Sequence, residues 1–384
     1  MHPSRYRYAR LLLALGCFAA LLVGCRTERE AAEVVRRQRP EAGAPRAFMM
    51  GFTDTPAALT PEAYTATFDL ASNYGEVILV QRAVAWADFV PGAKVSDGLR
   101  EQTVRARQAA SERGLTLAVA IDPFDPAARG RLQGLPPKYT GKTLADGDLR
   151  KAFVADAVFV ARTAKPAYLA LGIEVNTTFE RNPEGYLAFV EAYKEAYDAV
   201  KAVSPETKVF PGFQYEELLG ILPDLPPHPP RWQLLEAYGA KMDLLAITTY
   251  PSFVYEVARK VPPGYYTEIT KQTKLPVAFL SAGFASAPGR ENLNSSTPPE
   301  QRRYLQRLIE DADALASPLL VWYAGRDPGF VQSPPFDLLR SLGLRDAHDQ
   351  AKEAWAAWEA ASNRPFDPLT PPRAPTPAPA TSRR

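Results

Sequence analysis

Eight short apolar runs, separated by amphipathic segments, repeat along most of the chain between residues 48 and 361. Each run is almost continuously apolar, which is typical of parallel strands buried on both faces. We expect these strands at residues 48–52, 76–81, 115–121, 168–175, 208–213, 243–248, 276–280 and 318–323. The intervening segments predict helices at residues 61–72, 99–113, 148–163, 183–203, 231–238 and 299–315. Eight strands alternating with helices predict an α/β fold, a (β/α)8 TIM barrel that covers residues 47–361.

A doubly wound open sheet is the alternative arrangement for such a pattern. That fold usually carries a glycine-rich, phosphate-binding turn after its first strand. The sequence Gly51-Phe52-Thr53-Asp54 is not such a turn, so the closed barrel is favoured. The helix prediction is weakest at residues 255–273, which contain two prolines and a glycine.

Residues 1–25 have the pattern of a cleaved export signal. Three arginines, at positions 5, 7 and 10, precede an apolar run at 11–23, which is about half the length that a bilayer-spanning helix needs. The sequence Leu22-Val23-Gly24-Cys25 resembles the lipobox of bacterial lipoproteins. This resemblance implies that Cys25 is acylated and anchors the protein to a membrane. The alternative is an ordinary secreted protein in which Cys25 has no special role.

The segments on either side of the barrel are predicted to be tethers. Residues 26–46 are charged and rich in alanine, whereas residues 362–384 repeat proline with alanine and threonine. The second segment cannot bury a core, and we expect it to be disordered. In lipoproteins, aspartate directly after the lipid-bearing cysteine often signals retention at the inner membrane. Arg26 occupies that position here, which favours an exported protein anchored at the outer membrane.

Several classes of function are excluded by the scarcity of cysteine and histidine and by the balance of charge. Cys17 lies in the export signal, so no disulfide or thiolate metal site is available to the mature chain. With only three histidines, a Ser-His-Asp triad or a histidine-rich metal site is not expected. The 45 basic and 43 acidic residues leave no basic surface for nucleic acid. We therefore expect no metal, no cofactor and no nucleic-acid partner.

Polar and aromatic residues follow the predicted strands at the end where barrel enzymes place their function. Rings can stack on the apolar face of a sugar, while amides and acids bond its hydroxyls. A carbohydrate site at these strand ends is therefore predicted, although any one of the residues could be polar only because strand ends are solvated. The expected substrate-binding residues are Asp54, Arg82, Trp86, Asp122, Asn176, Gln214, Glu216, Tyr250, Trp322 and Asp327.

The end of the fourth predicted strand resembles a signature of clan A glycoside hydrolases. In Leu171-Gly172-Ile173-Glu174-Val175-Asn176, Glu174 matches the general acid/base of those enzymes. Ile173 replaces the asparagine that usually bonds the substrate 2-hydroxyl in the family. This departure puts the catalytic competence of the site in doubt.

The seventh predicted strand carries a second resemblance to the same clan. Residues 274–284 are similar to the segment that holds the family's nucleophilic glutamate, with Pro276-Val277 and Gly283-Phe284 fixing the register. In that register Ser281 occupies the nucleophile position. The sequence Ile247-Thr248-Thr249-Tyr250-Pro251 is similar to the sixth-strand tyrosine segment. Arabinogalactan endo-galactosidases and their relatives are the most similar family.

Three interpretations of the barrel follow. The first is a carbohydrate-binding protein, with an oligo- or polysaccharide as partner, whose catalysis is impaired by Ser281. The second is an active glycosidase in which Glu174 is the acid and Glu216 or Asp327 is the second carboxylate. The third is a scaffold or interaction lipoprotein without enzymatic activity, since a fold alone does not determine function. Glu174 could also be a purely structural carboxylate paired with an arginine such as Arg82.

Overall fold

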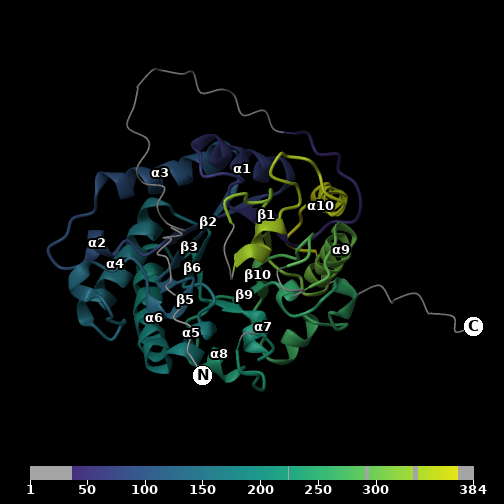
Figure 1. Ribbon diagram of the computed structural model, residues 1–384. Coiled ribbons are helices and arrows are strands. Elements are labelled where there is room, and N and C mark those ends of the chain that lie inside the picture. Colours follow the sequence, from purple (N-terminus) through teal and green to yellow (C-terminus); the bar gives the residue numbers. More distant parts are fainter. Residues whose placement is uncertain (1–36, 224, 290–293, 332–335, 371–384) are drawn as a thin grey trace, which may run out of the picture.

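The fold is a parallel barrel with helices packed around it (Figure 1). The computed structural model describes residues 37–223, 225–289, 294–331 and 336–370. The main sheet has the strand order β7-β6-β3-β2-β1-β11-β10-β9-β8, and its neighbouring strands are parallel. Its members are β1 (Met49–Thr53), β2 (Val77–Ala83), β3 (Thr116–Asp122), β6 (Tyr168–Leu171), β7 (Lys208–Phe210), β8 (Gly212–Gln214), β9 (Leu245–Thr249), β10 (Val277–Ala282) and β11 (Leu319–Trp322).

The two edge strands of this sheet are halves of one chain run, interrupted only at Pro211. β7 pairs with β6, and β8 pairs with β9, so residues 208–214 join both edges of the sheet. Proline has no N–H to give to a strand ladder, which explains the break. The nine segments therefore fill eight barrel positions, and the predicted (β/α)8 fold is confirmed.

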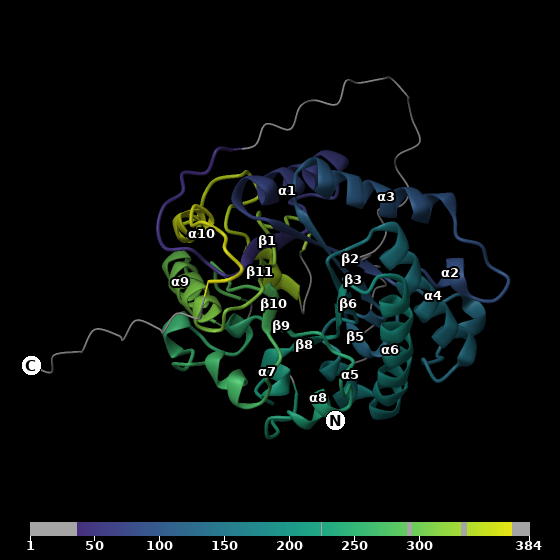
Figure 2. The same ribbon diagram turned by 180° about the vertical axis from the view of Figure 1, so that it is seen from behind.

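Helices cover the outside of the barrel (Figure 2). They are α1 (Pro61–Tyr74), α2 (Trp86–Phe89), α3 (Asp97–Glu112), α4 (Gly147–Thr163), α5 (Asn176–Arg181), α6 (Pro183–Val203), α7 (Tyr215–Leu218), α8 (Gln233–Glu236), α9 (Pro298–Ala314) and α10 (Trp355–Ser362). Three of the long helices begin where the sequence provides caps: Thr60, Asp146 and Asn182 each accept a backbone N–H of the first turn. In the region of the weakest helix prediction, the chain forms only the short 3-10 segments η3 (Ala258–Lys260) and η4 (Thr267–Lys271).

A short hairpin after β3 is absent from the sequence-based expectations. It consists of β4 (Phe124–Asp125) and β5 (Ala128–Leu132), which pair antiparallel. Because it follows the C-terminal end of β3, it lies at the end of the barrel where the candidate site is expected. We call this end of the strands the mouth, and the opposite end the floor.

Residues 37–46, predicted to be the end of a tether, lie against the floor of the barrel. Arg46 is fully buried, and it donates to the carbonyl of Ala361 and pairs with Glu76. A parallel bridge joins Arg46 to Phe366, on the predicted disordered tail. The described part of that tail, up to residue 370, is thus attached to the barrel, and Arg364 pairs with Asp313 of α9 at 2.7 Å. The rest of the tail (371–384), the rest of the tether (26–36) and the export signal lie outside the described residues.

Within the part of the chain that the structure describes, no helix has both the length and the apolar character required to span a bilayer.

Candidate functional site

The chain turns sharply after β6, and this turn positions Glu174. The predicted strand continues to residue 175, but β6 ends at Leu171 because Gly172 has a φ of +89°. A side chain at Gly172 would also come within 2.8 Å of the Phe189 ring. Glu174 itself has a φ of +51°, an uncommon left-handed conformation for a residue other than glycine. Such strained positions concentrate at functional sites.

Five residues from four strand ends meet at the mouth, and we call them the mouth cluster: Glu174, Thr248, Tyr250, Ser281 and Tyr323. The Thr248 hydroxyl donates to Glu174 Oε1 at 2.9 Å. Thr248 is the ladder partner of Ser281 on the neighbouring strand. The Tyr250 hydroxyl donates to Ser281 Oγ at 2.8 Å, and the Tyr250 and Tyr323 rings meet edge to face at 6.0 Å. The structure therefore brings the two predicted catalytic positions, 174 and 281, into one connected group.

Burial raises the pKa of Glu174, and the Arg129 guanidinium opposes this shift. Arg129, on β5, pairs with Asp122 at 2.5 Å and contacts the Thr177 hydroxyl at 3.3 Å. Asp122 also accepts the backbone N–H of Ile173 at 3.4 Å, so it supports the turn before Glu174. Asp122 is thus placed beside the site, with its charge balanced by Arg129. The structural alternative for Glu174 does not involve Arg82.

Three other predicted residues form a buried polar network at the ends of β8 and β9. The Asn176 amide bridges to the backbone of Gln214, donating to its carbonyl at 2.9 Å and accepting its N–H at 2.8 Å. The Gln214 amide donates to Glu216 at 2.6 Å. Glu216 has no exposed surface, and its carboxylate also accepts from the Thr249 hydroxyl at 2.5 Å and the backbone N–H of Tyr250 at 3.2 Å. Burial raises the pKa of Glu216 to about 7.

Three predicted sugar-binding residues point away from the mouth. Because side chains alternate along a strand, Arg82 turns outward from β2 and pairs with the buried Asp156 of α4 at 2.5 Å. Trp86 is 1% exposed, and its indole N–H donates to the carbonyl of Gln133. Trp322 is fully buried beside Tyr304, with its N–H donated to the carbonyl of Leu342. Neither tryptophan presents a ring to a ligand.

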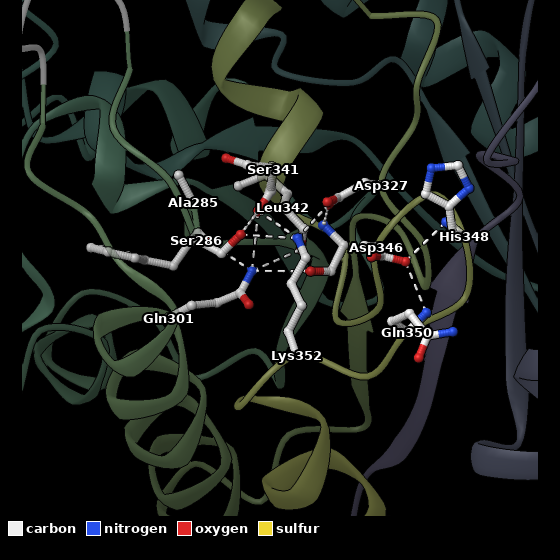
Figure 3. Close-up of polar contacts among 12 residues, drawn as sticks. Ala285, Ser286, Gln301, Asp327, Ser341, Leu342, Asp346, His348, Gln350 and Lys352 are labelled. Atoms are coloured by element: carbon white, nitrogen blue, oxygen red, sulfur yellow. Dashed lines mark hydrogen bonds and ion pairs between the residues drawn. The ribbon is translucent and has the colours of Figure 1, made fainter.

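Asp327 belongs to a separate network that holds the chain after β11 (Figure 3). The Lys352 ammonium lies 2.6 Å from Asp327 and 2.9 Å from the Ser286 hydroxyl. Nearby, the Gln301 side chain donates to several carbonyls, among them that of Phe284 at 2.9 Å. Asp327 is therefore engaged in fastening loops together.

Asp54 also turns away from the mouth cluster, toward the outer helix α1. It accepts the backbone N–H of Gln81 at 3.2 Å and lies 3.4 Å from the Tyr64 hydroxyl. Burial raises the pKa of Asp54 to about 7. Its hydrogen-bond donors are neutral groups, a backbone N–H and a phenol.

A cavity of about 760 Å³ opens at another part of the molecule, between residues 42–43 and helices α9 and α10. Its most prominent charged groups, Asp313 and Arg364, are paired with each other. It contains none of the predicted site residues, so the mouth cluster remains the candidate functional site.

Sequence reasoning did not select Thr248, Tyr323 or Arg129 as site residues. Thr248 carried a usable signal, because hydroxyl residues interrupt an otherwise apolar strand just before Tyr250. Tyr323 directly follows the strand residue Trp322, and strand alternation would have favoured the tyrosine over the tryptophan as the mouth-facing residue. Arg129 lies on the hairpin that the sequence pattern did not predict.

No known family profile matches the chain, and no curated protein matches it by sequence. Solved glycoside hydrolases share its fold. An exo-beta-1,4-mannosidase from Opitutaceae bacterium strain TAV5 superposes with a TM-score of 0.61 at 16% identity, covering 84% of this chain and 60% of that one. A GH5_18 protein from Bifidobacterium longum subsp. longum, in complex with Manb1-4GlcNAc, gives 0.61 at 16% identity over 83% of this chain and 80% of that one.

The GH53 catalytic domain from Ignisphaera aggregans gives a TM-score of 0.59 at 14% identity, covering 84% of this chain and 98% of that one. The chain thus spans about three fifths of the mannosidase but nearly all of the GH53 domain. At these identities the likeness establishes the (β/α)8 barrel fold, which the chain shares with these glycoside hydrolases.

Proposed function

We propose that this chain is an exported lipoprotein whose barrel binds an oligo- or polysaccharide and has lost most or all of its hydrolytic activity. The observation that carries the proposal is that the mouth cluster contains one carboxyl group, Glu174, which accepts from the Thr248 hydroxyl, and one hydroxyl group, Ser281, beside Thr248 on the neighbouring strand. Two carboxylates would be required at these positions for retaining hydrolysis, about 5 to 5.5 Å apart.

Ser281 is poorly equipped to replace a nucleophilic carboxylate. A serine hydroxyl is protonated at neutral pH and needs an adjacent base to become a nucleophile. The Tyr250 hydroxyl donates a hydrogen bond to Ser281, and burial raises the pKa of that phenol well above its usual value. A neutral phenol donates a hydrogen bond to the serine oxygen and cannot take its proton.

The inverting alternative needs a second carboxylate facing a water near Glu174. Glu216 is buried with both oxygens accepting hydrogen bonds. Asp327 is paired with Lys352. These contacts support impaired catalysis over an active inverting enzyme.

The mouth cluster keeps features that suit sugar recognition. Tyr250 and Tyr323 provide adjacent rings, and Glu174 and Tyr250 provide hydrogen-bonding groups beside them. Glu174 is also held in a strained backbone conformation, which a purely structural role would not require. The Manb1-4GlcNAc disaccharide bound by the Bifidobacterium longum neighbour is a suitable first probe, together with galactan and mannan oligosaccharides.

Binding and catalysis can be tested with one set of variants. The wild type should bind an oligosaccharide in calorimetry and hydrolyse activated aryl glycosides barely or not at all. Ser281→Glu should create or strongly raise hydrolysis, and adding Ile173→Asn should raise it further. Ser281→Gln, of the same size but without charge, is the matched control and should remain inactive, as should Ser281→Glu combined with Glu174→Gln.

The outcomes separate the three interpretations. Robust wild-type hydrolysis that disappears in Glu216→Gln or Asp327→Asn would favour the active inverting enzyme. If no glycan binds and the Ser281→Glu variant is inert although folded, the scaffold interpretation is favoured.

The anchor can be tested independently of the sugar site. Cys25→Ala should abolish incorporation of a palmitate analogue and release the protein from the membrane fraction. Cys17→Ala is the matched control, because its cysteine precedes the predicted cleavage point, and it should remain anchored. Continued labelling of Cys25→Ala would rule out the lipoprotein assignment, and fractionation of the two membranes would test the outer-membrane location.

A further inference from the structure

A second group of polar side chains lies on the loops that follow the fourth and fifth barrel strands. Glu180 is in α5, Glu217 is in α7, and His228 is in the loop before α8. One ligating atom from each residue lies within 4.8 Å of those of the other two. We call these three residues the Glu–Glu–His cluster. None of them belongs to the mouth cluster.

The hydrogen bonding of His228 points to a cation. His228 Nδ1 lies 2.8 Å from the carbonyl oxygen of Pro229, and because a carbonyl only accepts, Nδ1 carries a proton. In the neutral ring, Nε2 then presents a lone pair, and it lies 3.3 Å from a carboxylate oxygen of Glu217. Two acceptors that face each other need either a proton or a metal ion between them. A backbone carbonyl that fixes the tautomer in this way is the usual arrangement behind a metal-bound histidine.

The backbone around His228 is built to hold the ring in place. Gly220 has a φ of +72°, and a Cβ there would lie 1.9 Å from the His228 carbonyl and 2.6 Å from its Nδ1. Only glycine therefore allows the loop to fold this closely over α7. The loop is also pinned by a hydrogen bond from the Arg231 N–H to the carbonyl of Leu218 at 2.8 Å. Pairs of prolines at 226–227 and 229–230 restrict its conformation further.

Arg231 pairs with Glu180 of this cluster. It does not saturate the site, because a carboxylate has two oxygens and can bind a guanidinium with one and a metal with the other.

We propose that the Glu–Glu–His cluster binds a divalent metal ion, and that the ion is zinc. One imidazole nitrogen and two carboxylate oxygens are a ligand set that zinc uses, at about 2.0 to 2.2 Å from each donor. Donors at such distances from one ion are separated by about 3 to 4 Å, so the observed spacing requires only a small contraction. The ion would fasten α5, which begins two residues after Glu174, to α7, and would thereby hold two loops of the mouth.

The test uses the full chain carrying Cys17→Ala and Cys25→Ala, so that no thiol competes for the metal. After removal of metals with a chelator, zinc should bind with a stoichiometry of one per chain by elemental analysis and should raise the melting temperature. His228→Gln and Glu217→Gln should each weaken zinc binding at least tenfold. His348→Gln is the matched control, because that histidine is exposed and lies on another loop, and it should bind zinc as before.

Two further measurements keep the outcome independent of variant folding. Cobalt added to the metal-free parent should give the visible absorption of a tetrahedral or five-coordinate site. Nitrogen NMR of the metal-free parent should show a proton shared between Nε2 of His228 and Glu217, and zinc should displace this proton while Nδ1 stays protonated. The proposal is overturned if no stoichiometric zinc binds, if His228→Gln binds it unchanged, or if both ring nitrogens remain protonated in the presence of zinc.

Discussion

Replacing Glu216 by glutamine should change how the stability of the barrel depends on pH. Glu216 is fully buried, and it accepts hydrogen bonds from neutral donors: hydroxyls, an amide and a backbone N–H. Burial therefore raises its pKa from an ordinary 4.5 to about 7 in the folded state. Between these two values the folded protein binds a proton that the unfolded chain has lost. The contribution of Glu216 to stability consequently falls as the pH rises from 4.5 to 7.

The size of the effect follows from that interval. At 1.36 kcal/mol per pH unit, a pKa that rises from 4.5 to about 7 corresponds to about 3 kcal/mol. A glutamine can keep the contacts, with its oxygen toward the Gln214 amide and the Tyr250 N–H and its NH2 toward the Thr249 and Tyr265 hydroxyls. The free energy of unfolding of Glu216→Gln, relative to wild type, should therefore increase by about 3 kcal/mol between pH 4.5 and pH 8.

Urea unfolding at several pH values measures this difference directly. Subtracting wild type from variant at each pH cancels the contributions of other groups, including Asp54, whose pKa is also raised to about 7. Glu62→Gln, on the exposed side of α1, is the matched control, and its difference from wild type should stay nearly constant. A difference that is equally flat for Glu216→Gln would refute the reasoning, because it would mean that the buried carboxylate ionises as easily as in water.

Three further substitutions test the packing. Asp156→Ala leaves the Arg82 guanidinium without its buried partner and should cost about 3 to 5 kcal/mol in urea unfolding, whereas a loss below about 1 kcal/mol would mean that water replaces the carboxylate. Gly172→Ala must adopt a positive φ against the Phe189 ring, so it should lower the free energy of unfolding by more than about 1 kcal/mol; an unchanged value would show that the turn after β6 relaxes easily. Trp322→Phe should lower the melting temperature, because it loses the hydrogen bond to Leu342, but it should leave any glycan affinity unchanged. Tyr250→Phe should weaken the glycan affinity. The reverse pattern would place the ligand elsewhere.

The barrel could be predicted because each buried strand is recognisable from its own run of apolar residues. Buried parallel strands are apolar along their whole length, and helix caps such as Asp146 mark the boundaries between elements. The hairpin β4–β5 escaped prediction because it is short and its residues have no apolar periodicity. The floor segment at 37–46 escaped because its contacts are made by arginines, which sequence reasoning assigns to solvent.

The strand ends that form the site could be predicted from the sequence, but the direction in which each side chain points could not. A shift of one residue at the end of a strand turns a side chain from the mouth to the surrounding helices. This separates Tyr323, beside Tyr250, from Trp322, which is buried against Tyr304. The same one-residue shift explains why Arg82 points outward from the barrel. Its partner Asp156 is far away in sequence and could not be identified without coordinates.

The pairing of Arg46 with Phe366 has a consequence for how the molecule would stand on a membrane. Both described ends of the chain leave from the floor of the barrel, on the side opposite the mouth cluster. Eleven residues lie between Cys25 and Arg37, so a lipid on that cysteine could lie at most about 40 Å from the point where the described chain begins. A lipid on Cys25 would thus tether the barrel from the side opposite the mouth cluster, so the anchor would not lead to the face that carries the candidate site.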